Sequence, residues 1–241
     1  MRPVVEFREV GYEIAGRKIL SGVSLSVEEG ETLVLLGRSG SGKSTALKLT
    51  NGVLFPTRGE VLVEGRSTRD WHPIELKRRI GYVIQEVGLF PHFNVARNVG
   101  LVPTLAGWSE AEVERRVNEL LETVGMPASE YRTRFPRQLS GGQRQRIGVA
   151  RALAVDPTLL LFDEPFGALD PVTRLELQQQ FQTWQRDFGK TALFVTHDIR
   201  EALRLGTHIA LLANGRVELT TRAADFKQAD TPEARALLAC L

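Results

Sequence analysis

The residues best suited to chemistry lie in the stretch GRSGSGKST, residues 37–45. Its glycines allow successive backbone N–H groups to turn towards a polyphosphate, and its lysine can reach the outer phosphates. The serine after the lysine offers a hydroxyl to Mg²⁺. The pattern predicts a phosphate-binding loop, with a glycine-rich turn between two core elements as the alternative. The predicted contacts are Gly37, Ser39, Gly40, Ser41, Gly42, Lys43, Ser44 and Thr45.

A second candidate is a pair of carboxylates, Asp163 and Glu164, which follows the apolar run of residues 159–162. Such a run predicts a buried parallel strand, and α/β sheets bind ligands at the carboxyl ends of their strands. Asp163 is suited to orienting Mg²⁺, and Glu164 to polarising an attacking water molecule. The alternative is a strand end that carries two solvated acids.

A third stretch, LSGGQ at residues 139–143, has the composition of a second anion-binding helix start. Ser140 can cap a helix or donate to a phosphate, while Gly141 and Gly142 allow the backbone to approach an anion. One chain with two such sites needs an explanation.

Together these motifs resemble the ATPase subunit of an ATP-binding cassette (ABC) transporter, over nearly the whole chain. The resemblance implies ATP and Mg²⁺ as cofactors, with Ser44, Gln85 and Asp163 at the metal. It also implies that Glu164, His197 and Gln85 serve catalysis, His197 as the switch histidine and Gln85 in the Q-loop. Residues 167–170 would form the D-loop.

The resemblance further implies that two copies of the chain enclose two ATP molecules, which would explain the second anion site. Each nucleotide would contact the phosphate loop of one copy and Ser140, Gly141, Gly142 and Gln143 of the other. The other implied partners are integral membrane permease subunits and a separate substrate-binding protein. They would hold the chain at the cytoplasmic face of the cell membrane.

Adenine recognition departs from the family pattern. Family members usually stack the base on an aromatic residue after the first strand, and the spacing places Ile14 there. Tyr12 lies two residues earlier and would face the same side of an extended chain. We therefore predict Tyr12 as the stacking residue, with the position of Ile14 as the alternative.

Positioning these residues requires an α/β fold of the P-loop NTPase type, with a central, mostly parallel sheet. Alternation in residues 4–10 and 18–27 predicts an N-terminal antiparallel β subdomain, and residues 32–36 predict a buried strand before the phosphate loop. Residues 69–79 predict a helix with Pro73 in its first turn. Residues 1–241 would form one domain, whose core is residues 1–85 and 146–241. Helical periodicity predicts an inserted α-helical subdomain at residues 86–145.

Composition narrows the function further. The 241 residues carry a net charge of +2, which gives no general electrostatic case for binding nucleic acid. The only cysteine, Cys240, excludes an intramolecular disulfide and fits a reducing compartment. Neither a secretion signal nor a run of about 20 apolar residues is present, so we expect a soluble chain that others hold at the membrane.

The stretch IGYVIQEVGLFPHFNVARNV, residues 80–99, resembles importer ATPases that serve quaternary amine osmoprotectants such as glycine betaine, choline or carnitine. Residues 89–93 could contact a permease or pack inside the helical subdomain. Amino acid or anion importers and a soluble ABC ATPase remain as alternatives. A P-loop kinase or GTPase would leave LSGGQ and His197 unexplained.

Overall fold

The computed structural model describes residues 3–85 and 88–241, and its largest sheet is the predicted, mostly parallel one. Its strand order is β10-β9-β3-β8-β7-β6, and every neighbouring pair except β9 with β10 is parallel. The strand bounds are Thr32–Leu36 (β3), Ile80–Val83 (β6), Leu159–Asp163 (β7), Thr191–Thr196 (β8), His208–Ala213 (β9) and Arg216–Arg222 (β10). Asn214 and Gly215 both have positive φ in the hairpin turn between β9 and β10, as an Asn-Gly turn of this kind requires.

The N-terminal part forms a four-stranded antiparallel sheet of order β2-β1-β4-β5. Its strands are Val5–Ile14 (β1), Arg17–Val27 (β2), Arg58–Val63 (β4) and Arg66–Ser67 (β5). β1 and β2 pair from Ile14 with Arg17, so Ala15 and Gly16 form the tight turn between them. The predicted antiparallel subdomain is confirmed.

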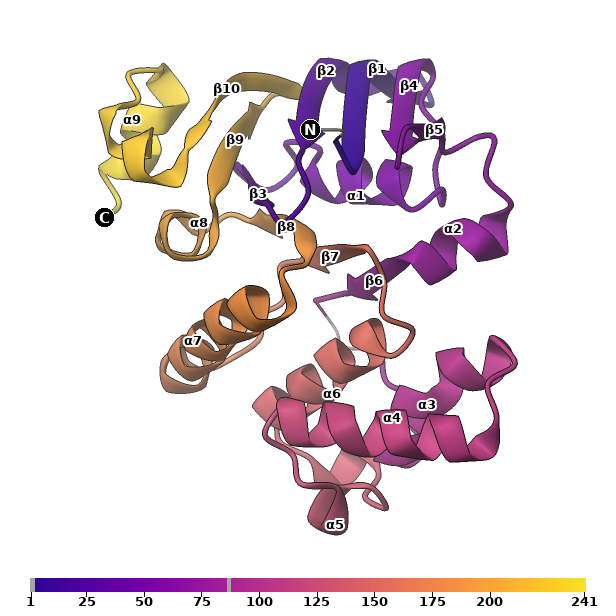
Figure 1. Ribbon diagram of the computed structural model, residues 1–241. Coiled ribbons are helices and arrows are strands. Elements are labelled where there is room, and N and C mark those ends of the chain that lie inside the picture. Colours follow the sequence, from indigo (N-terminus) through magenta and orange to yellow (C-terminus); the bar gives the residue numbers. More distant parts are fainter. Residues whose placement is uncertain (1–2, 86–87) are drawn as a thin grey trace.

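Figure 1 shows helix α1 (Lys43–Thr50) between this antiparallel sheet and the strands of the parallel sheet. The side chains of β3 alternate between two apolar clusters. Leu33 and Leu35 pack in the cluster that contains α1 and the antiparallel strands, and Val34 and Leu36 pack in the cluster of the helices on the other face. Both faces of β3 are therefore covered, which explains its uninterrupted apolar sequence.

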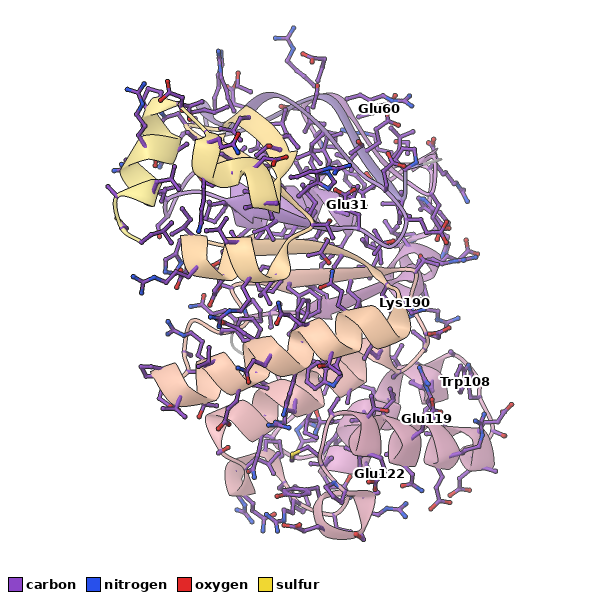
Figure 2. The ribbon with its side chains drawn as sticks, turned by 60° about the vertical axis from the view of Figure 1, so that its left-hand side comes forward. Glu31, Glu60, Trp108, Glu119, Glu122 and Lys190 are labelled. Carbon is purple, nitrogen blue, oxygen red and sulfur yellow. The ribbon has the colours of Figure 1, made fainter. Side chains whose placement is uncertain are left out.

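The predicted helical subdomain contains α3 (Val95–Leu105), α4 (Glu110–Thr123), α5 (Ala128–Tyr131), a 3₁₀ turn η1 (Pro136–Gln138) and α6 (Gly141–Leu153). Figure 2 places Trp108, Glu119 and Glu122 at this end of the molecule, opposite Glu60, with Glu31 and Lys190 between them. The predicted start of the subdomain at residue 86 lies outside the described residues. Its predicted end at residue 145 falls within α6, so the division of the chain remains a prediction.

The remaining helices are α2 (Pro73–Arg79), α7 (Pro171–Phe188), α8 (Ile199–Leu205) and α9 (Pro232–Leu238), with a 3₁₀ turn η2 (Ala223–Gln228). The helix predicted from residue 69 begins only at Pro73, because His72 is extended and a proline without an N–H fits the first helical position. None of the helices in the described part of the chain combines the length and the apolar character that crossing a membrane requires.

Four phenylalanines join β7 and β8 to α7 on the helical face of the sheet. The ring centroid of Phe194 lies 5.6 Å from that of Phe162, 5.8 Å from that of Phe166 and 5.6 Å from that of Phe181. Phe194 is fully buried. This cluster fixes the distance between the strands that end at the candidate site and the helix that covers them.

We expect Phe194→Ala to lower the free energy of unfolding by about 3–5 kcal/mol, because it leaves a cavity where dense packing cannot collapse. Denaturant unfolding followed by circular dichroism measures the loss. The control is Val53→Ala, which truncates an apolar side chain that is 55% exposed. Equal losses in the two variants would contradict the central place of this cluster.

Candidate functional site

The phosphate loop joins the end of β3 to the start of α1, as predicted. Gly42 is the residue before α1 and has φ 106°, a left-handed conformation that side chains disfavour. A Cβ atom on Gly37 would lie 2.2 Å from the carbonyl oxygen of Leu212, which leaves no room for a side chain. The glycines thus allow the loop to pass tightly against β9 and open into a helix start that favours anions.

Lys43 is almost completely buried within this loop. Its Nζ donates hydrogen bonds to the carbonyl oxygens of Gly37, at 2.8 Å, and Arg38, at 2.9 Å. Burial lowers the pKa of the Lys43 ammonium, while the charges of Glu164 and Asp163 act in the opposite direction. The cation that sequence analysis assigned to the phosphates is therefore held inside the loop and close to both predicted carboxylates.

Asp163, at the end of β7, is held by two hydroxyl groups. Ser44 Oγ donates to Asp163 Oδ1 at 2.8 Å, and the Tyr82 hydroxyl donates to Asp163 Oδ2 at 3.3 Å. Burial, and then the charge of Asp163 and this hydrogen bond, raise the pKa of the Tyr82 phenol. Ser44 and Asp163, which the sequence placed at one metal, are thus in direct contact, whereas Tyr82 was missed because a single sequence does not show that β6 lies beside β7.

The oxygen atoms of Ser44 and Asp163 are of the kind that Mg²⁺ prefers. No cluster of three or more acidic, histidine or cysteine side chains able to hold a metal exists within residues 3–85 and 88–241. Mg²⁺ takes few protein ligands and completes its shell with water and substrate phosphates, so two oxygen donors from the protein suffice. Ser44 and Asp163 are therefore the residues that would hold the ion, and the metal role of Gln85 stays a prediction.

Glu164 follows Asp163 and lies beside His197, which follows β8. His197 Nδ1 is 2.9 Å from Glu164 Oε2, and the backbone N–H of Glu164 donates to the carbonyl oxygen of Val195 at 3.0 Å. Glu164 also lines the hollow beside the phosphate loop, together with Lys43 and Ser44. The two predicted catalytic residues thus meet next to the predicted phosphate site.

Gln85 lies in a neighbouring groove. That groove, of about 320 Å³, is lined by Gln85, Gly141 of the LSGGQ stretch and Leu169 of the predicted D-loop, among others. A Cβ atom on Gly167 would lie 3.3 Å from Gln85 Nε2, so the side chain of Gln85 reaches the D-loop. Its predicted catalytic role remains a prediction.

The LSGGQ stretch opens α6, as predicted. Ser140 Oγ accepts the N–H of Gln143 at 3.2 Å, and Gln143 Oε1 accepts the N–H of Ser140 at 2.9 Å, which forms a capping box. A Cβ atom on Gly142 would lie 2.5 Å from Thr173 Cγ2, and one on Gly141 would lie 3.4 Å from Leu169 Cδ2. The two glycines therefore let α6 approach the start of α7 closely.

The LSGGQ stretch does not contribute to the hollow beside the phosphate loop. Among described residues that hollow is lined by Arg17, Ile19, Ser39, Gly40, Gly42, Lys43, Ser44, Thr45 and Glu164. Figure 1 shows α1 and α6 on opposite sides of β6 and β7, and the two helices belong to different apolar clusters. One copy of the chain therefore presents the two anion-binding segments at separate places.

Tyr12 lines a third hollow, with Lys18 and Arg58 among others, whereas Arg17 borders the phosphate loop. Ile14 pairs with Arg17 and is 57% exposed. Tyr12 as the adenine-stacking residue stays a prediction. Arg17 was not singled out from the sequence, because nothing there indicates that its strand begins beside the phosphate loop.

A second contact that the sequence did not reveal ties the phosphate loop to the C-terminal helix. Arg38 Nε donates to Glu233 Oε1 of α9 at 2.6 Å. The two residues are far apart in the chain, and no local pattern links them. The ion pair places α9 next to the loop that carries Lys43.

The comparisons with known proteins agree with this geometry. The sequence profile of the ABC transporter family matches residues 20–167. The chain is 49% identical to the glycine betaine uptake system ATP-binding protein YehX of Escherichia coli, over 89% of this chain and 69% of that protein. It is 48% identical to the osmoprotectant import ATP-binding protein OsmV of Salmonella typhimurium, over 83% of this chain and 52% of that protein. The chain thus spans about half of the second relative.

Among solved structures, the chain resembles a dimeric ATP-binding cassette, MJ0796, in a post-hydrolysis state bound to ADP and Pi. The TM-score is 0.79 and the identity 34%, and the match covers 91% of this chain and 98% of that one. Fold, motifs and sequence similarity therefore agree. The chain belongs to the ABC transporter family and carries its ATPase cassette.

Proposed function

We propose that two copies of the chain bind ATP between them and hydrolyse it to drive uptake of a quaternary amine osmoprotectant. The observation that carries the hydrolytic part is the pairing of Glu164 with His197 at 2.9 Å, beside Lys43 and Ser44. A carboxylate oriented by a histidine, next to a phosphate-binding loop, is an arrangement suited to activating water for attack on a phosphorus atom.

In this proposal Lys43 and the N–H groups of the phosphate loop bind the outer phosphates and offset their negative charge. Mg²⁺, held by Ser44 and Asp163, would neutralise further charge on those phosphates. Glu164 orients a water molecule and accepts its proton as the new oxygen–phosphorus bond forms and the bond from the γ-phosphorus to ADP breaks. His197 keeps the Glu164 carboxylate in place through Nδ1.

Two observations support a site shared between copies. Ser140, Gly141 and Gly142 form a helix start that favours an anion, yet they lie apart from the hollow at Lys43 of the same chain. The related MJ0796 cassette is dimeric. In our proposal the LSGGQ stretch of each copy, including Gln143, completes the site of the other.

The cargo, the membrane partners and the location rest on similarity. YehX and OsmV are named for uptake of glycine betaine and osmoprotectants. We propose the same solute class here, with permease subunits that hold the chain at the cytoplasmic face of the membrane and a substrate-binding protein that delivers the solute. An importer of amino acids or anions is the alternative, because all these classes share the ATP site.

We expect Glu164→Gln to reduce steady-state ATP hydrolysis by about a hundredfold or more while ATP still binds, because phosphate binding rests on the loop at Lys43. Phosphate release and nucleotide binding by filtration measure the two effects. Glu218→Gln, which neutralises an exposed acid on β10, is the control. Retention of most of the wild-type turnover would contradict the role of Glu164.

Mixing a Lys43→Ala variant with a Ser140→Arg variant tests the shared site. Each variant alone damages both sites of its dimer, whereas a mixed dimer keeps one site with an intact Lys43 and an intact Ser140. Random pairing should therefore restore up to about one quarter of the wild-type ATPase rate. An inactive mixture whose heterodimers are verified by mass spectrometry would argue against a site shared between copies.

The cargo is tested by uptake of labelled glycine betaine, choline and carnitine in cells with and without the gene, at high and low osmolarity. Other uptake systems for these solutes must be deleted first. We expect uptake of at least one of the three to fall when the gene is absent, since each transported molecule requires hydrolysis in the cassette. Unchanged uptake of all three, together with lost import of an amino acid or anion, would select the alternative.

A further inference from the structure

A buried polar network lies behind His197 and contains an acid that the mechanism has not used. Glu201 of α8 is 5% exposed. Its Oε2 accepts a hydrogen bond from Thr196 Oγ1 at 2.6 Å, and its Oε1 accepts one from Gln178 Nε2 at 3.0 Å. Burying a carboxylate costs free energy unless it is hydrogen-bonded, and these two hydrogen bonds offset that cost.

Thr196 connects Glu201 to the turn of residues 196–198, which contains His197. It is the last residue of β8 and directly precedes His197. Its hydroxyl donates its single hydrogen to Glu201, which leaves the oxygen to accept the backbone N–H of Asp198 at 3.0 Å. The Thr196 hydroxyl therefore links the residues directly before and after His197. The hydrogen bond to Glu201 fixes the direction in which this hydroxyl points.

The same carboxylate is tied to the helix that begins at the D-loop. Gln178, which donates to Glu201, lies in α7 and accepts a hydrogen bond from Arg204 Nη1 at 2.7 Å. Two turns towards the start of α7, its N-cap Asp170 is the last residue of the D-loop, and Arg174 donates to the carbonyl oxygen of Leu169 at 3.1 Å.

The charged groups that bear on Glu201 come from both helices. Burial and the charge of Asp198 raise the pKa of the Glu201 carboxyl, while its bonds to Thr196 and Gln178 and the charge of Arg174 lower it. Arg174 lies in α7, beside the D-loop, and Asp198 lies at the start of α8. The Glu201 carboxylate therefore lies between α7 and α8, and both helices carry charges that act on it.

We infer that Glu201 is a positioning residue for ATP hydrolysis: through Thr196 it holds the turn that keeps His197 Nδ1 on Glu164, and through Gln178 it ties that turn to the D-loop helix. The inference rests on the proposed function. Glu201 touches neither ATP nor water in this scheme. It acts only by fixing the position of His197.

Two conservative variants test the inference. Glu201→Gln can still accept from Thr196 but turns an amide N–H₂ towards the N–H₂ of Gln178, and Thr196→Val removes the hydroxyl and keeps the shape. We expect each to lower kcat for ATP hydrolysis by about tenfold, with KM for ATP within about twofold, because a small displacement of an orienting group costs rate more than binding. Unchanged kcat in both folded variants would overturn the inference.

A swap of the two side chains provides the rescue. In the double variant Glu201→Gln with Gln178→Glu, the amide can donate to the new carboxylate and still accept from Thr196. The new carboxylate also faces Arg204, and the net charge is unchanged. We expect the swap to regain most of the lost kcat. A double variant that folds but remains as slow as Glu201→Gln would show that the hydrogen-bond pairing is not what matters.

The matched control is Gln182→Ala, since Gln182 Nε2 donates to the backbone carbonyl of Arg204 at 2.7 Å. That bond also joins α7 to α8 but is not connected to Thr196. We expect this variant to leave kcat within about twofold of the wild-type value, because it removes an exposed contact only. A tenfold loss here would mean that any weakening of the α7–α8 contact slows hydrolysis, which would overturn the specific role of Glu201.

Amide hydrogen exchange separates the inference from the proposed function. In Glu201→Gln the two facing amide groups displace the partner of Thr196, and Thr196→Val removes the oxygen that accepts the Asp198 N–H. We expect both changes to accelerate exchange at the N–H of Asp198 by tenfold or more, and Gln182→Ala to leave it unchanged. This readout needs no ATP. A wild-type chain without ATPase activity would refute the proposed function, whereas unchanged exchange at Asp198 in both variants would refute the positioning itself.

Discussion

The parallel pairing of β3, β8 and β7 is the interaction on which the site depends. Leu36 of β3 lies opposite Thr196 of β8, and Asp163 of β7 lies opposite Val195. Because parallel strands end at one edge of the sheet, the residues that follow each of them emerge within one residue of the same level. The backbone hydrogen bonds of the sheet therefore bring the phosphate loop, the carboxylates and the histidine together, and their side-chain contacts follow from that placement. The buried rings of Phe162 and Phe194 pack against each other on the helical face of the sheet and stabilise the pairing of β7 with β8.

The sheet also separates the parts that it does not join. Helix α1 packs on one face, and α6, which begins at the LSGGQ stretch, packs on the other. Each anion-binding segment is fixed firmly by its own apolar cluster, so a rearrangement within one chain that brought them together would break one cluster or the other. In the proposed dimer, a second copy would supply the missing donors without disturbing either cluster. This separation supports the proposal that two chains assemble around the nucleotide, and in that proposal assembly is the step that would move the membrane subunits.

The sequence predicted the parts of the site that local patterns encode. Residues 32–36 form the predicted buried strand and the LSGGQ stretch opens the predicted helix, because both patterns lie in neighbouring residues. The helix predicted from residue 69 was wrong about its start, because the constraint that proline places on the preceding residue outweighed the helical pattern. The contacts of Tyr82 with Asp163 and of Glu201 with Thr196 could not be predicted. They depend on which strands and helices are neighbours, and a single sequence does not show strand order.

Lys43 has a consequence for how quickly a nucleotide can bind. Its ammonium donates to two carbonyl oxygens of its own loop, and these bonds hold the loop around it. Binding is then an exchange of acceptors around a cation that is already in place. In the proposed mechanism little chain entropy would be lost at that moment, and we expect diffusion and charge, rather than loop folding, to set the association rate. Release would follow the same route in reverse: once phosphate had left, the two carbonyl groups would again accept the hydrogen bonds of Lys43, so its buried charge would keep its partners.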